Sequence, residues 1–272
     1  MKHPDYSTPM VMGVLNVTPD SFSDGGTYIN SDTACHRVEA MICEGASIID
    51  IGGESTSPGS DLITKKEELE RVTPVLKAVV SRFPDTFFSI DTTKYEVGKA
   101  ALDHGVHIVN DVSGLQKEPG LAKLCAEYDA TLVIMHSQGN PKTMQKSPFY
   151  KDVVQEVNAF FAKQAAQAQQ DGCKKIVLDP GIGFGKKLHH NITLLANLDK
   201  FHVHGLPLMI GASRKASIGQ ILNDRAVEGR LAGTLAVHYD AMIKGCKIIR
   251  VHDVKEAFDT ILIYNAIHSL NN

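Results

Sequence analysis

Residues 13–26 read GVLNVTPDSFSDGG, an apolar run followed at once by a segment rich in turn-forming residues. The run begins at Met10 and ends at Asn16, as expected of a buried strand. Pro and Gly interrupt regular structure, so residues 18–26 are expected to form a loop. In this expected loop Phe22 is a large apolar residue among small polar ones. We therefore expect Asn16 to lie at the mouth of a site and residues 18–26 to form a flap over it. An ordinary strand-to-helix turn is the alternative.

Apolar runs of strand length alternate with longer amphipathic segments throughout the chain. Most of the runs are continuous in Val, Ile and Leu, which is typical of parallel strands that are buried on both faces. The expected strands are residues 10–15, 47–51, 86–90, 106–109, 131–135, 175–178, 207–210 and 247–251. The expected helices are residues 33–44, 65–82, 96–104, 120–128, 152–170, 190–201, 226–243 and 254–270.

Eight strand–helix units in about 250 residues are typical of a (β/α)8 barrel, the α/β fold also called a TIM barrel. An open, doubly wound sheet is the alternative, but the Gly-rich fingerprint that usually follows its first strand is absent. No linker divides the chain, so we expect a single domain over residues 1–272.

Composition narrows the class of protein and its partners. A net charge of −3 provides no basic surface for nucleic acid. No apolar run approaches the ~20 residues of a membrane span, and the polar N-terminus lacks a secretory segment. The five cysteines include no CxxC pair, which favours a reducing compartment. We expect a cytoplasmic protein without nucleic-acid or membrane partners.

Polar side chains stand at the carboxyl end of every expected strand. In a barrel these ends and the loops after them build the active site. They are Asn16, Asp50, Asp91, Asn110 with Asp111, His136, Asp179, Ser213 to Lys215, and Arg250 with His252. A single Asp at such a position could instead cap the following helix. Helix capping is a weaker explanation for polar residues at the ends of all eight strands. We expect a pocket rich in carboxylates with a cationic rim.

The chemistry of this set indicates the kind of ligand. Buried carboxylates cost several kcal/mol each unless they are paired, so Asp91 and Asp179 favour a ligand with several N–H donors. Asn110 can donate and accept, and the planar guanidinium of Arg250 can stack on a ring. A planar heterocycle with an amidine-like edge and a carbonyl satisfies these groups. Arg250, His252 and the Ser/Thr-rich residues 55–57 could hold an anion such as phosphate.

The segment DPGIGFGK at 179–186 has the wrong spacing for a phosphate-binding P-loop or a dinucleotide fingerprint. We expect its glycines to let the backbone approach a flat ligand, with Phe184 lining it; a loop without function is the alternative. Four histidines near helix ends lack a third ligand at metal spacing. We expect these four at the surface: His189, His190, His202 and His204.

The chain resembles the dihydropteroate synthase family from about residue 10 to residue 268. The matching stretches are GVLNVTPDSFSDGG (13–26), IDIGGEST (49–56), SIDTTK (89–94), IVNDVSG (108–114), VIMHSQGNP (133–141), LDPGIGFGK (178–186), GASRKASIG (211–219) and IIRVHDVKE (248–256). The resemblance implies a barrel enzyme, usually a homodimer, of the family that sulfonamides target. Such enzymes join 6-hydroxymethyl-7,8-dihydropterin pyrophosphate to p-aminobenzoate, giving 7,8-dihydropteroate and pyrophosphate for folate biosynthesis.

The resemblance also implies roles for individual residues. Those that would bind the pterin are Asp91, Asn110, Met135, Asp179, Phe184, Gly211, Lys215 and Arg250. Asn16 would hold Mg²⁺. Those that would contact pyrophosphate or p-aminobenzoate are Phe22, Thr56, Ser57, Pro58, Ala216 and His252. The implied catalytic residues are Asp91, Lys215 and Arg250. Pyrophosphate leaves first and Arg250 would stabilise its charge, whereas Asp91 would be the carboxylate near the cationic dihydropterin.

Two positions depart from the family pattern. The loop after the second strand usually reads STRPG, but here Ser57 replaces the Arg. Ala216 replaces the Ser that commonly follows the SRK lysine. These departures leave open a pterin-binding homologue without synthase activity. A second alternative is a methyltransferase domain that uses methyltetrahydrofolate with a corrinoid partner, because such domains share the barrel and the carboxylate pocket. The TPDSFSDGG and SRK motifs favour the synthase over the methyltransferase.

Overall fold

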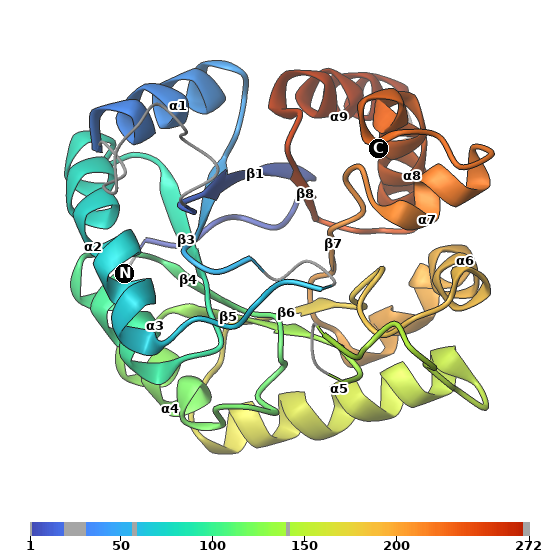
Figure 1. Ribbon diagram of the computed structural model, residues 1–272, viewed down its shortest axis with the longest axis horizontal. Coiled ribbons are helices and arrows are strands. Elements are labelled where there is room, and N and C mark those ends of the chain that lie inside the picture. Colours follow the sequence, from blue (N-terminus) through green and yellow to red (C-terminus); the bar gives the residue numbers. More distant parts are fainter. Residues whose placement is uncertain (1, 19–30, 56–58, 140–141, 269–272) are drawn as a thin grey trace.

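The computed structural model describes residues 2–18, 31–55, 59–139 and 142–268. In these residues eight parallel strands form a ring that the helices surround (Figure 1). The strands are β1 Met10–Asn16, β2 Ile48–Gly52, β3 Phe87–Asp91, β4 Ile108–Asp111, β5 Thr131–Met135, β6 Ile176–Asp179, β7 Met209–Ile210 and β8 Ile248–Val251. They pair in the order β6-β5-β4-β3-β2-β1-β8-β7, and a bridge from Leu178 to Leu208 closes the ring. The predicted (β/α)8 barrel is confirmed.

The helices of the described chain follow the strands in order. They are α1 Ser31–Cys43, α2 Lys65–Arg82, α3 Tyr95–Asp103, α4 Gly120–Glu127, α5 Val153–Gln170, α6 Leu188–Ala196, α7 Ala216–Ile221, α8 Leu231–Ile243 and α9 Val254–His268, with 3-10 turns η2 Leu198–His204 and η3 Val227–Arg230. The helix expected over 190–201 is divided, because Asn197 leaves helical geometry and its side chain donates to the Thr193 carbonyl. The short α7 was not predicted, since six residues show no clear periodicity.

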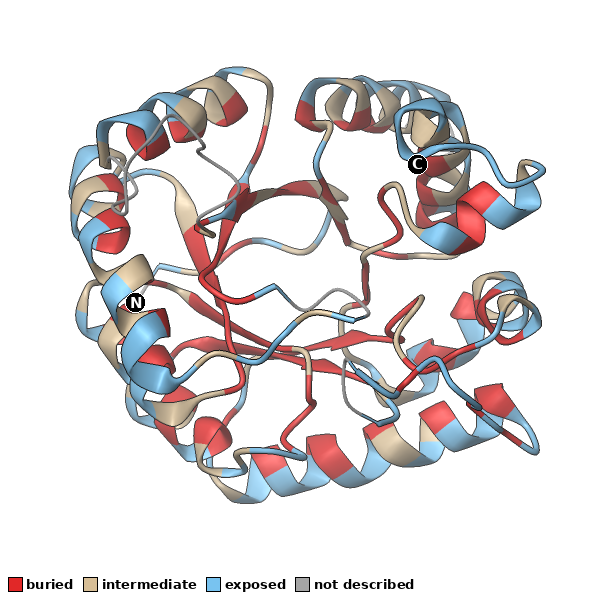
Figure 2. Cartoon of the chain, viewed as in Figure 1, coloured by how far each residue is buried: buried red, intermediate tan, exposed pale blue. Residues whose placement is uncertain are grey.

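Two apolar layers bury the strands. One lies between the ring and the helices, whose inward faces are buried in Figure 2. The other fills the barrel interior and consists of Met12, Ile48, Ile108, Val133, Val177, Met209 and Ile248, none more than 1% exposed. Alternate residues of each strand face these two layers, which explains the continuous apolar runs. We call the second group the inner apolar layer.

Several strands extend one residue beyond the predicted apolar run and end on a polar residue. β3 ends at Asp91, which is in register with Gly52 of β2 and Asn110 of β4. Met135 of β5 is likewise in register with Asp179 of β6. The backbone positions of these polar residues are therefore fixed by hydrogen bonding within the sheet. None of the helices in the described ranges is long and apolar enough to cross a membrane.

Candidate active site

Arg250 holds two carboxylates together at the centre of the barrel mouth. Its Nε donates to Asp50 Oδ2 at 2.7 Å, and a terminal nitrogen donates to Asp91 Oδ2 at 2.8 Å. Asn110 Nδ2 donates to the same Asp50 oxygen at 3.0 Å. Asp50, Asn110 and Arg250 each stand two residues beyond a member of the inner apolar layer on the same strand. Because side chains repeat every two residues along a strand, all three point into the barrel.

Burial dominates the electrostatics of this cluster. It raises the pKa of Asp91 to about 8; Arg250 opposes the rise, whereas Asp50 and Glu68 add to it. Burial also acts to lower the pKa of Arg250, but Asp50 and Asp91 outweigh it, so the guanidinium stays charged. Within the described chain no donor reaches the Oδ1 atoms of Asp50, Asp91 and Asn110. Three buried acceptors without donors cost about 1–3 kcal/mol each, and a ligand rich in N–H groups would satisfy them.

Asp179, Lys215 and Phe184 form the opposite side of the mouth. Asp179 Oδ1 accepts the Gly181 N–H at 2.7 Å. Lys215 Nζ donates to the Ile182 carbonyl at 2.5 Å and lies 4.0 Å from the centroid of the Phe184 ring. Burial lowers the pKa of Lys215 to about 7, although Asp179 opposes this. This side thus combines a carboxylate, an ammonium and an aromatic face.

A cavity of about 310 Å³ lies between these two groups. Its lining residues are Asn110, Val112, Met135, Asp179, Gly181, Ile182, Phe184, Gly211, Lys215 and Arg250. Seven of the residues predicted for pterin binding are among them, and Asp91 stands behind Arg250. A Cβ at Gly211 would lie 3.8 Å from Asp179 Oδ2, so the glycine leaves room for a ligand there. The few convergent polar groups beside apolar walls suit one small, flat molecule.

Other predicted residues lie at the rim or outside the described chain. His252 and Ala216 are exposed beside the mouth and do not line the cavity; His252 Nδ1 is 3.0 Å from Ser213 Oγ. Asn16 is exposed at the end of β1, and its Oδ1 lies 3.9 Å from where a Gly52 Cβ would stand. Phe22, Thr56, Ser57 and Pro58 lie outside the described residues, and so does the proposed flap apart from Thr18.

The structure gives a specific role to Asp50, for which its expected place at a strand end indicated none. Asp50 Oδ2 accepts hydrogen bonds from both Arg250 and Asn110. Its spacing of two residues from Ile48 was the available signal. Val112 and Ile182 line the cavity with side chains or backbone that no polarity pattern marks.

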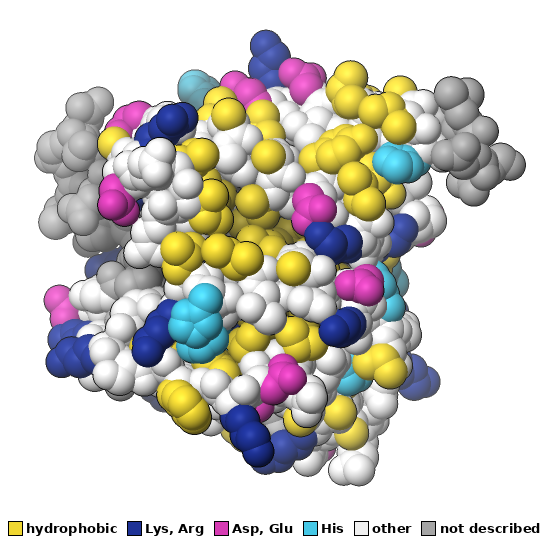
Figure 3. Space-filling model, turned by 90° about the vertical axis from the view of Figure 1, so that its right-hand side faces the viewer, with side chains coloured by type: hydrophobic (Ala, Val, Ile, Leu, Met, Phe, Trp, Pro, Cys, Tyr) yellow, Lys and Arg dark blue, Asp and Glu magenta, His cyan; other side chains and the backbone are white. Residues whose placement is uncertain are grey.

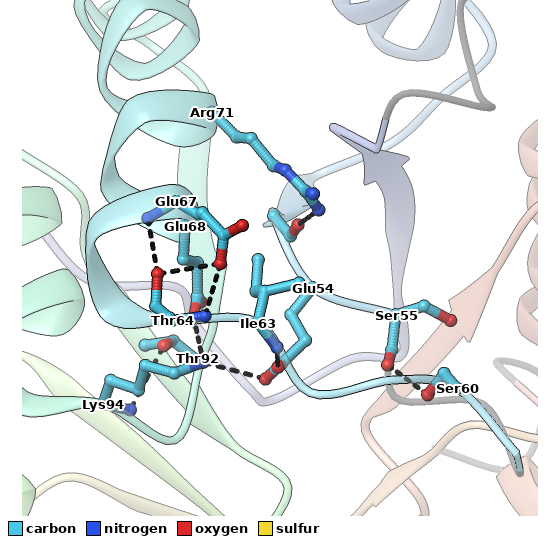
Figure 4. Close-up of polar contacts among 11 residues, drawn as sticks. Glu54, Ser55, Ser60, Ile63, Thr64, Glu67, Glu68, Arg71, Thr92 and Lys94 are labelled. Carbon is cyan, nitrogen blue, oxygen red and sulfur yellow. Dashed lines mark hydrogen bonds and ion pairs between the residues drawn. The ribbon is translucent and has the colours of Figure 1, made fainter.

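A buried ion network joins the β2–α2 loop to the end of β3 (Figure 4). Lys94 Nζ donates to Glu54 Oε2 at 2.9 Å and also to Glu68, which is fully buried on α2. The other oxygen of Glu54 accepts the Ile63 N–H at 2.7 Å, closing the loop at its base. Burial favours a lower pKa for Lys94, but the two glutamates raise it. The network holds both ends of the loop that carries residues 56–58.

The start of α2 is stabilised by conventional capping beside this network. Thr64 and Glu67 form a reciprocal capping box, and Arg71 donates to the Gly53 carbonyl at 2.9 Å (Figure 4). Gly53 packs so closely that a Cβ there would lie 2.7 Å from Val72. These contacts fix where the loop leaves β2 and where it enters α2.

A second cavity of about 570 Å³ adjoins the first, and Val112 and Phe184 are walls of both. Its lining residues are Glu54, Ser55, Leu62, Thr93, Val112, Ser113, Gln116, Lys117, Ser137, Gly139, Met144 and Phe184. The lining of this second cavity is thus mixed: four apolar side chains stand beside hydroxyl and amide groups, one carboxylate and one ammonium.

The histidine expectation is wrong at one position. His189 and His202 are exposed and His204 is half-buried, but His190 is buried and its Nδ1 accepts the Lys187 N–H at 3.1 Å. The reason is that His190 is the third residue of α6, which begins at Leu188: its ring folds back to accept the Lys187 N–H and packs against Tyr150.

Comparisons with known proteins agree with the site geometry. The family described as "Pterin binding enzyme" matches residues 12–252. The dihydropteroate synthase of Escherichia coli K12 is 50% identical over 264 residues, which are 96% of this chain and 93% of that one. The crystal structure of Yersinia pestis dihydropteroate synthase with a sulfonamide drug complex has a TM-score of 0.91 at 45% identity, covering 98% of this chain and 96% of the other.

A third comparison concerns an enzyme crystallised with a small aromatic acid. Xanthomonas albilineans dihydropteroate synthase with 4-aminobenzoic acid has a TM-score of 0.90 at 39% identity, covering 97% of this chain and 94% of the other. The similarity to these enzymes, in sequence and in fold, therefore extends over almost the whole chain. The chain belongs to the pterin-binding enzyme family and, within it, to the dihydropteroate synthases.

Proposed function

We propose that this protein joins 6-hydroxymethyl-7,8-dihydropterin pyrophosphate to p-aminobenzoate, forming 7,8-dihydropteroate and releasing pyrophosphate. The observation that carries the proposal is the 310 Å³ cavity lined by Asn110, Asp179, Lys215 and Arg250. A pterin ring presents N–H donors along one edge and a carbonyl beside them. Asp179 and Asn110 would accept from that edge, and Lys215 would donate to the carbonyl. Met135 and Phe184 supply apolar contact for the ring.

Arg250 and Asp91 would act on the reacting end of the pterin. The bond from the methylene carbon to the diphosphate oxygen breaks, and the diphosphate leaves with the electron pair. Positive charge then spreads over the dihydropterin. A positive charge forming beside Asp91 lowers its raised pKa and favours the carboxylate, so stabilisation appears where the charge develops. The p-aminobenzoate amine then attacks the methylene carbon and loses a proton. No protein nucleophile is required.

Asn16 is our proposed ligand for Mg²⁺. Its exposed amide at the end of β1, beside Gly52 in the neighbouring strand, fits a site that supplies one protein oxygen. Mg²⁺ commonly takes one or two protein oxygens and completes its shell with substrate phosphates and water. When bound, the ion would neutralise charge on the leaving diphosphate.

The rim residues are proposed to hold pyrophosphate and the second substrate. His252 and Thr56 would contact pyrophosphate, and Phe22, Pro58 and Ala216 would border p-aminobenzoate. Support comes from the place of His252 and Ala216 beside the mouth and from the ion network that anchors the loop of residues 56–58. The acid crystallised with the Xanthomonas albilineans enzyme has the chemistry of that second substrate.

A pyrophosphate-release assay with both substrates tests the proposal. Release that depends on p-aminobenzoate supports the synthase. Pterin binding without release would instead support an inactive homologue. Absence of release together with methyl transfer from methyltetrahydrofolate to a corrinoid would support the methyltransferase alternative.

We also propose a homodimer in the cytoplasm. Large apolar side chains remain exposed on the last helices of the chain, and Figure 3 shows hydrophobic side chains gathered on that side. They are Ile221, Val227, Ile243, Leu262, Ile263 and Ile267. Burying such a surface against a second copy would remove it from water. Sedimentation of the protein and of an Ile263→Lys variant tests the dimer.

All five cysteines are free, which suits a reducing compartment such as the cytoplasm.

A further inference from the structure

Lys186 is a buried cation to which the proposed chemistry gives no task. It ends the segment DPGIGFGK and is 3% exposed, whereas the next residue, Lys187, is exposed. Burial lowers the pKa of Lys186 to about 7, while nearby Asp179 opposes this. A lysine is seldom buried so completely unless its ammonium has several partners.

The ammonium of Lys186 lies among acceptors from two loops. Nζ donates to the carbonyl oxygens of Gly181 at 3.0 Å, Phe184 at 3.1 Å and His136 at 3.1 Å. It also lies 2.9 Å from His136 Nδ1. Burial lowers the pKa of His136 to about 2, and the charge of Lys186 adds to that, so this imidazole is neutral and Nδ1 can accept. Lys186 therefore satisfies backbone carbonyls that would otherwise converge without a donor.

The loop held in this way is pressed against the backbone after β5. A Cβ at Gly181 would lie 2.0 Å from the His136 carbonyl, and one at Gly185 would lie 2.2 Å from the Gln138 carbonyl. Both glycines have positive φ, 68° and 62°. The Tyr150 hydroxyl adds a further hydrogen bond, donating to the Gly185 carbonyl at 2.9 Å. Such a turn leaves its carbonyls facing inward, where the N–H groups of Lys186 Nζ reach them.

The same loop forms one wall of the active-site cavity. Gly181, Ile182 and Phe184 line it, and the Ile182 carbonyl accepts the hydrogen bond of Lys215. We propose that Lys186 is a positioning residue whose ammonium acts as an internal cation that folds residues 181–185 into the wall of the pterin cavity. It sets Phe184 and the acceptor for Lys215 without touching the ligand. The ligand identity rests on the proposed function, whereas the loop geometry does not.

Lys186→Met and the matched control Lys187→Met test this assignment. The readouts are amide hydrogen exchange of residues 181–185 and calorimetric binding of 6-hydroxymethylpterin. Loss of a charged buried donor should weaken binding by about tenfold or more and speed exchange in the loop. Lys187→Met should leave both unchanged. A folded Lys186→Met protein with unchanged exchange and affinity would overturn the proposal.

Chemical rescue separates a cation requirement from general packing and remains informative if Lys186→Met does not fold. In Lys186→Ala, ammonium chloride should slow loop exchange and restore stability and binding more than sodium chloride at the same ionic strength of about 0.1 M. Equal effects of the two salts would contradict the assignment. If the wild type lacks p-aminobenzoate-dependent release while Lys186 still controls loop exchange, only the proposed function fails.

Discussion

Two layers on the same strands have opposite chemistry. Ile48, Ile108, Val177 and Ile248 fill the barrel, and two residues further along the same strands stand Asp50, Asn110, Asp179 and Arg250. Both sets face inward because the strand period is two. The inner apolar layer stabilises the barrel by leaving water. The polar layer retains buried acceptors without donors, so it favours ligand binding at the expense of stability. Moving two residues along a strand therefore changes its contribution from folding to recognition.

The largest effect should come from Arg250→Met in the polar layer. It leaves Asp50 and Asp91 buried without their shared partner, which costs about 3–5 kcal/mol of unfolding free energy. Turnover in the pyrophosphate-release assay should fall by about 100-fold or more, because the same guanidinium faces the cavity. Adding Asp50→Asn to this variant should recover part of the stability but not the activity. An Arg250→Met enzyme with near-normal turnover would contradict the role given to Arg250.

A pair of substitutions on β4 tests the division between layers directly. Ile108→Ala should lower the unfolding free energy by about 2–4 kcal/mol, with little change in pterin affinity. Asn110→Ala removes an unsatisfied acceptor together with one hydrogen bond to Asp50 Oδ2, an oxygen that Arg250 still binds, so it should cost only about 1 kcal/mol of stability and yet weaken pterin binding by about tenfold or more. Urea unfolding and calorimetry measure the two quantities. Equal effects of both variants on both quantities would mean that the layers are not distinct.

Lys186, buried behind the cavity wall, gives the stability of the protein a pH dependence that the inner apolar layer does not. The pKa of Lys186 falls to about 7 on folding, from the ordinary value near 10.5. Between these values the unfolded chain binds the extra proton, so stability should rise with pH over this window. From pH 8 to pH 10 the Lys186 contribution is at most about 3 kcal/mol, and Lys186→Met should lack it. Urea unfolding at pH 8 and at pH 10 gives the change of unfolding free energy with pH, which Ile108→Ala should share with the wild type. The same change in all three proteins would refute this prediction.

The smallest effects are expected at the two positions that depart from the family pattern. Ser57→Arg restores the cation usual in the family and should strengthen pyrophosphate or p-aminobenzoate binding by only about two- to fivefold, since a single ion pair in contact with water contributes about 0.2–1 kcal/mol. Ala216→Ser should act more weakly still. Steady-state kinetics with each substrate varied measure both. If Ser57→Arg changes neither apparent affinity nor turnover, the missing arginine has no consequence in this chain.

The sequence predicted the barrel well because burial on both faces leaves long Val, Ile and Leu runs that need no tertiary information. Strand ends were less accurate. Asp91 pairs with strands on both sides, yet an apolar pattern stops at Ile90. The split of the helix expected over 190–201 likewise depends on the Asn197 side chain, which periodicity does not register.

The sequence by itself determined which polar residues stand at the barrel mouth, since each follows an apolar strand at a readable position. Only the tertiary structure decided their partners. Asp50 and Arg250 are 200 residues apart, and Lys186 and His136 are 50 apart. Strand register and loop packing set those distances, and both depend on the whole ring closing. The sequence thus specified a carboxylate-rich pocket, whereas the fold assigned Arg250 to two carboxylates and Lys186 to the loop that forms the wall of that pocket.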